Sequence, residues 1–369
     1  MRKAQWIGAL VLLAIIAVSA VIKLQMDRSA PAAGGGAAAP NAPVTLKGIV
    51  GSEKEAFFGD KEVLDIARTR YGFALDIRKA GSLEMTEEAA LKANDFVFPA
   101  SETVVEQIKS SVQVTGTEEV FRTPLVYYSW DAVTRLLKER NIVRDAGADV
   151  LELDTAKLVE LIAADKKWED IGLKVFGPIA VDTSDPAKSN SGNAYAALVA
   201  ASLNGGNLVT ADRVDGLMPS LRNMFAKTGF KKSSTTDLFE EYVKTGMGSH
   251  KIIVGYESDV LYFSKQNPDV WQSLQSSVAP QIVYPAPTMW SVHTLVTLNE
   301  KSKGMTAFLQ DPDVQRIAWE RYGFRTGLIG VTNDPAAFRV KGIARSIDNV
   351  MQTPDYATMQ KLLEAYRAK

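Results

Sequence analysis

Short apolar runs alternate with longer amphipathic segments along the chain from residue 44 onward. In the first part of the chain, this alternation predicts strands over residues 46–50, 74–79, 95–98 and 124–129, and helices over residues 60–71, 85–92, 102–110 and 131–140. Strands that are separated by helices are typical of βαβ units. We therefore expect an α/β fold around a mostly parallel sheet.

The second part of the chain continues the pattern with more helix than strand. It predicts strands over residues 175–181, 251–256, 281–284 and 291–298, and helices over residues 156–164, 192–203, 217–228, 236–244, 301–309, 313–322, 343–350 and 357–368. The sequence contains no repeat of the solenoid kind. With 369 residues, the chain is long enough for about two domains.

Four of the predicted strands run into a Ser- or Gly-bearing loop that opens a helix. A helix N-terminus leaves backbone N–H groups unpaired and carries partial positive charge, so a small hydroxyl residue there either caps the helix or helps to hold a polar ligand. Because four such loops occur in what look like two halves, we expect them to share one polar cleft. The candidate ligand-binding residues in these loops are Gly51, Ser52, Glu53, Gly81, Ser82, Ser101, Ser189, Asn190, Ser191 and Gly192.

Three further candidates lie at the ends of other predicted strands. Ser129 ends the 124–129 strand within an aromatic stretch, where packing in the core is the alternative to ligand contact. Tyr256 and Glu257 lie where the 251–256 strand ends, and a solvated loop is the alternative there. Ligands of open α/β sheets bind at such strand ends, so all three residues are candidates for ligand contact.

The N-terminus has the pattern of an export signal. Arg2 and Lys3 precede an apolar run over residues 6–22, which is at the lower length limit for a membrane span. We predict a cytoplasmic N-terminus over residues 1–5 and a transmembrane signal anchor over residues 6–22, with a cleaved signal peptide as the alternative. Residues 23–43 are rich in Ala, Gly and Pro and are predicted to form a tether. Both alternatives export the folded body.

Composition and charge argue against several classes of function. The formal net charge of −1 and the lack of a nucleic-acid-binding motif argue against a nucleic-acid partner. The chain has no Cys and only two His residues, which excludes disulfides and a His-rich metal site. His293 alternates with its neighbours in a predicted strand, so we expect it to be structural. No Gly-x-Ser-x-Gly elbow, Walker A loop or dinucleotide fingerprint occurs, and we expect no catalytic residues, metal or cofactor.

The order of these pieces matches a known family. Gly51-Ser52-Glu53, Gly81-Ser82 and Pro99-Ala100-Ser101 follow the first three strands, residues 182–192 open the second half, and residues 308–327 resemble a closing helix and arm. In this order, the chain from about residue 44 resembles bacterial extracellular solute-binding proteins with the two-lobed type II periplasmic-binding fold. The branch that it resembles includes phosphate-, sulfate- and molybdate-binding components of ATP-driven importers.

The resemblance implies an α/β fold with two interlobe crossings, near residues 127–130 and 288–291. Lobe 1 would consist of residues 44–127 and 291–369, and lobe 2 of residues 128–290. Within the closing segment, Arg325 is expected to clamp the tail to the body through a bidentate salt bridge.

The resemblance also implies a function, which is to close two lobes on a small polar solute or oxyanion. The implied partners are a membrane permease and an ATPase. The implied location is the periplasmic side of the inner membrane, with the protein anchored by the N-terminal helix. If that helix is cleaved, the protein is instead soluble in the periplasm or secreted. Glu53 departs from the family pattern, because a carboxylate in the first loop repels a fully ionised oxyanion. The alternative function is a membrane-anchored structural or sensory component of an envelope complex that uses the fold without transport.

Overall fold

A computed structural model describes residues 42–227, 232–328 and 331–367. Residues 43–369 form one compact unit, and the account below concerns this unit alone. The predicted anchor over residues 6–22 and the predicted tether both lie outside the described residues, apart from the last two tether positions. Within the described residues, no helix is long and apolar enough to cross a membrane.

The first half of the unit is built on a mixed sheet. Its strands are β1 (Val44–Val50), β2 (Phe73–Lys79), β3 (Phe96–Phe98), β4 (Gly116–Trp130) and β9 (Trp290–Thr297), in the order β2-β1-β3-β9-β4. The first three strands run parallel to one another, as the βαβ pattern predicts, but β9 pairs antiparallel with both β3 and β4. The strand β9 reaches this sheet only after the chain has passed through the second half, and it inserts antiparallel between β3 and β4. This half of the sheet is therefore mixed, although β1 to β4 run in one direction as expected.

Both faces of this sheet are covered by helices, which explains why β3 and the C-terminal part of β1 are buried and apolar. Along β1, Leu46 and Val50 face one core and Ile49 faces the other. The helices α2 (Ser52–Phe58), α3 (Lys61–Tyr71), α13 (Met305–Leu309) and α14 (Pro312–Tyr322) supply the first core. The second core is supplied by η1 (Ser82–Thr86), α4 (Glu88–Ala93) and α5 (Glu102–Ser111).

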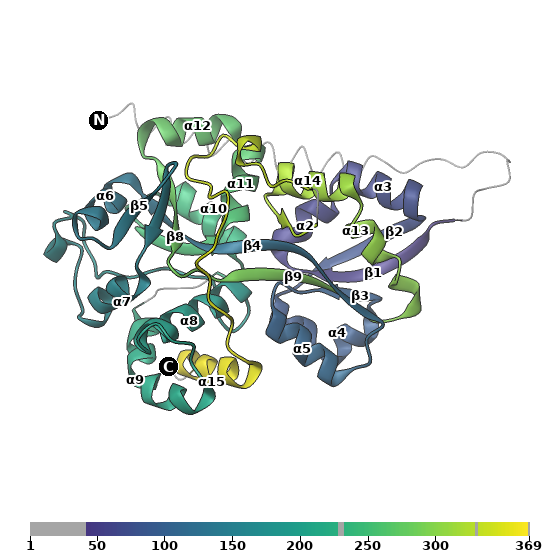
Figure 1. The fold of residues 1–369 in the computed structure, drawn as a ribbon, viewed down its shortest axis with the longest axis horizontal. Coiled ribbons are helices and arrows are strands. Elements are labelled where there is room, and N and C mark those ends of the chain that lie inside the picture. The colour runs from purple at the N-terminus through teal and green to yellow at the C-terminus, as the bar shows by residue number, and fades with distance from the viewer. Residues whose placement is uncertain (1–41, 228–231, 329–330, 368–369) are drawn as a thin grey trace. The chain divides into compact units, whose positions relative to one another are not determined.

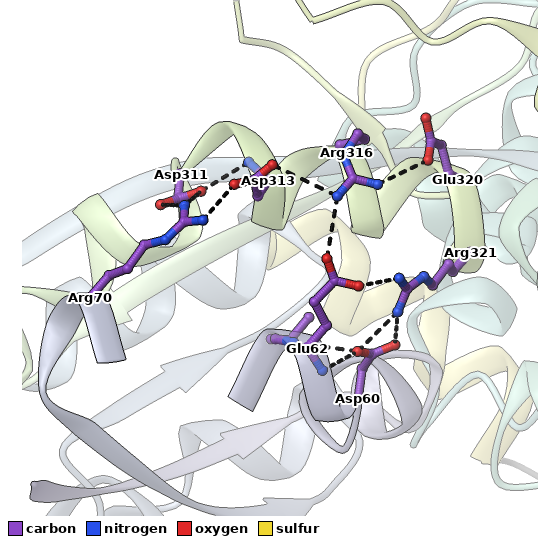
Figure 2. Close-up of polar contacts among 9 residues, drawn as sticks. Asp60, Glu62, Arg70, Asp311, Asp313, Arg316, Glu320 and Arg321 are labelled. Atoms are coloured by element: carbon purple, nitrogen blue, oxygen red, sulfur yellow. Dashed lines mark hydrogen bonds and ion pairs between the residues drawn. The ribbon is translucent and has the colours of Figure 1, made fainter. Parts of the chain in front are cut away.

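A polar network joins α3 to α14 although about 240 residues separate them in the sequence (Figure 2). Asp60 caps α3 by accepting from the backbone N–H groups of Glu62 and Val63, and it also accepts from Arg321 and from the Tyr322 hydroxyl. Partial burial acts to raise the pKa of Asp60, but these hydrogen bonds outweigh it and hold the pKa below its ordinary value. The cap thus also fixes α14 against α3.

The strands β4 and β9 extend from the first half into the second (Figure 1). Residues 116–124 of β4 pair with β9, whereas residues 125–130 pair with β7 (Ile252–Tyr256) and β8 (Pro280–Pro285). The sheet continues from β8 to β6 (Val150–Leu153) and then to the hairpin partner β5 (Val143–Gly147). The change of partners at residues 124–125 lies close to the predicted first crossing.

Helices surround the second part of the sheet and bury one continuous core. They are α6 (Asp131–Glu139), α7 (Thr155–Ala163), α8 (Asn190–Leu203), α9 (Ala211–Ala226), α10 (Thr235–Thr245), α11 (Glu257–Gln266) and α12 (Pro268–Ser277). Residues 191–201 of α8 are buried on every side, which its run of small Ala side chains permits. The short elements η2 (Glu169–Ile171), η3 (Glu300–Ser302), η4 (Pro335–Ala337) and β10 (Arg325–Thr326) complete the described fold.

The C-terminal tail packs on the second half, which differs from the predicted lobe 1 of residues 44–127 and 291–369. Helix α15 (Tyr356–Arg367) lies against α8 and α9, as Figure 1 shows. Phe338 and Ile343 belong to the same core as these helices. The physical reason is that the apolar side chains of the tail pack against a face of α8 and α9, whereas α3, α13 and α14 already cover the sheet of the first half.

The predicted clamp by Arg325 is confirmed. Its guanidinium donates to both carboxylate oxygens of Glu257, at 2.7 and 2.8 Å, and also to the carbonyl of Ala344 in the tail. Tyr284 donates to the same carboxylate and accepts from the Ala344 N–H at 3.0 Å. Glu257 and Arg325 are buried, so this clamp is a desolvated ion pair that ties the tail to α11.

Two predicted elements are absent from the described residues. Residues 175–181 form no strand and make only isolated bridges, because Gly177 adopts a φ of 111° and Pro178 lacks an N–H donor. Residues 343–350 form no helix; only Ile343 and Ala344 are buried, and most of residues 345–350 are exposed, so the segment lacks a continuous apolar face that would hold a helix against the core.

Candidate functional site

A polar cavity of about 620 Å³ lies where strand ends of the two halves meet. From the first half, its lining comes from the loop after β1, the end of β2, the start of η1 and the loop after β3. From the second half, the lining comes from the starts of α8, α10 and α11. A volume of this size is typical of a site for a small molecule.

Eight of the thirteen candidate residues line this cavity. They are Gly51, Ser52, Glu53, Gly81, Ser82, Ser189, Asn190 and Tyr256. They come from the ends of β1, β2 and β7 and from the loop before α8, so the structure brings together most of the loops that the sequence pattern singled out.

The other five candidates are outside the lining, and each is occupied or buried elsewhere. Ser101 contacts the Thr103 hydroxyl at 2.9 Å, and Ser129 is buried within β4. Ser191 is fully buried and bonds Ser184 at 2.6 Å, so it fixes the loop before α8 instead of facing the cavity. Gly192 and Glu257 are the remaining two. A Cβ on Gly192 would lie 2.3 Å from the Ser184 carbonyl, and Glu257 is bound to Arg325.

Several lining residues were not among the candidates from the sequence. They are Glu55, Lys79, Glu84, Lys188, Ser233, Ser234, Thr236, Asp237, Glu240, Ser258, Asp259, Tyr262 and Tyr322, with Ala56, Ala80 and Ala100. A signal existed for part of this group, because serines precede the predicted helix over residues 236–244. In the structure, Ser234 caps α10 by accepting from the Asp237 N–H at 3.2 Å. The start of α11 was missed because residues 257–266 were not predicted to be helical.

Glu53 reaches the cavity as half of a buried ion pair. Its side chain is 9% exposed and accepts a hydrogen bond from Lys54, which is fully buried. The ammonium group of Lys54 also lies 3.1 Å from Nδ1 of His293 and over the Phe98 ring. Burial lowers the pKa of Lys54, and burial and the charge of Lys54 lower the pKa of His293 well below its usual value. His293 is thus a neutral structural partner that accepts from Lys54.

Asp259 is the second buried carboxylate of the lining, and its side chain belongs to α11. It accepts from the backbone N–H of Tyr256 at 2.9 Å and from the Thr236 hydroxyl at 3.4 Å. Burial, with the negative charge of Glu53 nearby, raises the pKa of Asp259 to about 7. Among the described residues, no cationic group lies within ion-pair distance of it, so its charge is balanced only by dipoles.

Contacts between the two halves hold the cavity walls close together. The Asn190 amide donates to the Ala100 carbonyl of the first half, and also to the Tyr256 hydroxyl at 3.1 Å and to Ser291 at 3.3 Å. In the same loop before α8, the Lys188 carbonyl would lie 2.3 Å from a Cβ on Gly81. The backbone of the loop before α8 can therefore approach η1 only because residue 81 is glycine.

Comparisons with solved structures identify the fold. The chain is similar to the periplasmic binding protein AfuA from Actinobacillus pleuropneumoniae with fructose-6-phosphate bound (TM-score 0.55, 11% identity, 88% of this chain and 97% of that chain). It is also similar to iron-bound HitA from Pseudomonas aeruginosa (TM-score 0.54, 14% identity, 88% and 99%). A third similar structure is the sulfate-binding protein SubI from Mycobacterium tuberculosis H37Rv (TM-score 0.50, 13% identity, 81% and 93%).

These similarities establish that the body has the two-lobed fold of type II periplasmic binding proteins, as the resemblance in the sequence implied. No family model matches the sequence, and no curated protein matches it. Within the described part of the chain, no group of three His, Asp or Glu side chains gathers closely enough to hold one metal ion.

Proposed function

We propose that this protein is an extracytoplasmic solute-binding protein that closes two lobes on a small polar ligand. The observation that carries the proposal is the cavity of about 620 Å³, since its lining combines hydroxyls, an amide and charged groups from both halves. Sites of this kind fix a ligand through a few convergent polar groups. The fold shared with periplasmic binding proteins supports the same interpretation.

Closure would occur about the two predicted crossings, near residues 127–130 and 288–291. Both crossings belong to or adjoin β4 and β9, which pass between the halves. The tail connects the halves once more, because it leaves the first half after α14 and packs on the second half. A hinge at the two crossings needs only small backbone changes at strand ends, whereas each half moves with its own core intact. The contacts of Asn190 and Gly81 across the cavity are those expected of a closed arrangement.

The proposed location is the periplasmic side of the inner membrane. The apolar run at residues 6–22 would anchor the chain, with cleavage as the alternative, and residues 23–43 would let the body reach a membrane partner. A permease and an ATPase are the proposed partners for import, and an envelope sensor is the other proposed setting for the same binding reaction.

Thermal unfolding of the purified full-length protein in mild detergent tests the proposal. The panel contains sulfate, phosphate, fructose 6-phosphate, glucose, L-amino acids and organic cations. A ligand present at roughly 100 times its dissociation constant adds about 2.7 kcal/mol of stability, which raises the melting temperature by several degrees. If every compound leaves the melting temperature unchanged, the binding role loses its support and the anchored structural or sensory component becomes the better proposal.

A further inference from the structure

The cavity carries a strong excess of negative charge. Its lining contains the six carboxylates Glu53, Glu55, Glu84, Asp237, Glu240 and Asp259, but only two lysines, Lys79 and Lys188. One of these lysines is already paired, because Lys79 lies 2.9 Å from the Glu55 carboxylate. The charge pattern therefore differs from that of a site for a sulfate or phosphate group, where positive groups and N–H donors should exceed carboxylates.

Glu53 is paired with Lys54, Glu55 with Lys79, and Glu84 accepts from the Gly81 N–H, which leaves three carboxylates for a ligand. Asp237, Glu240 and Asp259 form no ion pair within the part of the chain that the structure describes. Asp259 is 6% exposed, so its charge is costly unless a cation arrives to balance it. Asp237 and Glu240 lie on α10 at the exposed edge of the cavity, where they attract a cation as it approaches.

A second observation points independently to a bound molecule. Ser258 is 3% exposed and borders the cavity, and its hydroxyl has no hydrogen-bond partner among the residues that the structure describes. Its backbone N–H is satisfied by the Thr123 hydroxyl at 3.2 Å, so only the side chain is left unpaired. A buried hydroxyl without a partner costs free energy, and at the cavity wall a ligand that draws this side chain toward it would supply the missing partner.

Aromatic faces complete the wall. Tyr262 and Tyr322 stack with ring centroids 5.4 Å apart and an interplanar angle of 16°, and both line the cavity with Tyr256. The hydroxyl of Tyr322 donates to Asp60 at 2.8 Å, so this ring is held in place by the network that joins α3 to α14. Tyrosine faces attract ammonium groups, and combined with carboxylates they form a site for a positively charged organic molecule.

We propose that the cavity selects a small organic cation carrying ammonium groups, with Asp259 and Ser258 as its buried contacts and Glu240 as a contact at the exposed edge. This inference rests on the proposed function and specifies its ligand class. The volume of about 620 Å³ exceeds the need of a bare ion and suits a molecule of several heavy atoms.

Calorimetric titration of the full-length protein with putrescine, spermidine, L-arginine and choline, and in parallel with sulfate, phosphate, fructose 6-phosphate and glucose, tests this inference. We expect at least one of the cations to bind and the anions and the sugar not to bind. Asp259→Asn should lower the affinity for the cation by roughly 10- to 100-fold, which is the range for losing a hydrogen bond to a charged group. Glu240→Gln should lower the same affinity by about 2- to 5-fold, because the Glu240 carboxylate is exposed.

Glu241→Gln is the matched control. Glu241 follows Glu240 on α10 but lies outside the lining, where it pairs with Lys232 at 2.7 Å. This control should leave the affinity within twofold of the wild type. If only an anion or the sugar binds, the inference about charge is overturned while the binding function stands. If none of the eight compounds binds, the inference and the binding function both fail.

Discussion

Asp259→Asn provides a test of the cavity that needs no ligand. Burial raises the pKa of Asp259 to about 7, whereas the same carboxyl in the unfolded chain ionises near pH 4. The groups that face it are Glu53 on α2, Glu240 and Thr236 on α10, the Tyr256 N–H, and the hydroxyl of Tyr128 on β4. Between about pH 4 and 7, the folded protein therefore retains a proton that the unfolded chain has released.

The direction in which stability changes with pH follows from this difference in proton binding. The contribution of Asp259 to stability is fully present below about pH 4 and is lost as the pH rises through about 7. At about 1.4 kcal/mol for each pKa unit, the loss reaches about 4 kcal/mol as an upper limit. Asparagine cannot ionise, but its side-chain oxygen can still accept from the Tyr256 N–H. The variant should therefore gain stability over the wild type at pH 8 and little or none at pH 4.

Urea unfolding followed by circular dichroism at pH 4, 6 and 8 measures this effect. The expected result is a gain for Asp259→Asn of about 1–4 kcal/mol at pH 8 that shrinks as the pH falls. Asp237→Asn is the matched control, since Asp237 lines the same cavity but is exposed, and its stability difference should be independent of pH. A difference for Asp259→Asn that is equal at all three pH values, or a loss of stability at pH 8, would refute the reasoning.

Three other substitutions test separate parts of the structure. Gly81→Ala adds a Cβ 2.3 Å from a backbone carbonyl on the other half, so small-angle scattering should show a larger radius of gyration than for the wild type. The control Gly216→Ala places its Cβ in open space on α9 and should not change the radius. Equal radii for the two variants would contradict the close approach. Arg325→Met leaves Glu257 buried without its partner and should lower the unfolding free energy by about 3–5 kcal/mol in urea, and a loss below about 1 kcal/mol would show that the clamp is not formed. Asp60→Ala removes the cap of α3 and should cost about 1–2 kcal/mol at pH 7. The cost should shrink as the pH falls below about 4, where the unfolded chain takes up a proton, and be lost as the pH falls through the lowered pKa of Asp60 in the folded protein; a cost that stays constant throughout acid titration would argue against an ionic role.

The parts of the fold with a strong local signal were predictable from the sequence. The helix that begins after Asp60 agrees closely with α3, because a side-chain cap, an apolar stripe and a terminal glycine mark its two ends. The strands β1 and β2 were also found, since they are apolar runs bounded by turn residues. In contrast, β4 begins eight residues earlier than predicted, because Thr117, Glu118 and Glu119 are polar and partly exposed and give no apolar run that marks a strand.

The candidate site was predictable where it depends on loops that open helices. Gly51, Ser52, Gly81 and Ser189 could be found because small residues at strand ends have a recognisable pattern. The charged groups could not be found in this way. Asp259 lies within a helix that starts directly after β7, and only the tertiary structure shows that its carboxylate is buried beside Glu53 without a cation. The sequence thus indicated a polar cleft but not its negative charge.

Hydrogen–deuterium exchange of the full-length protein, with and without a saturating concentration of the cation that binds most tightly, tests the central claim directly. The account predicts simultaneous protection of backbone amides at residues 51–58 and 80–84 in the first half and at residues 189–193 and 256–262 in the second half. Protection confined to one half, or located away from these four segments, would contradict the claim that both halves form one site.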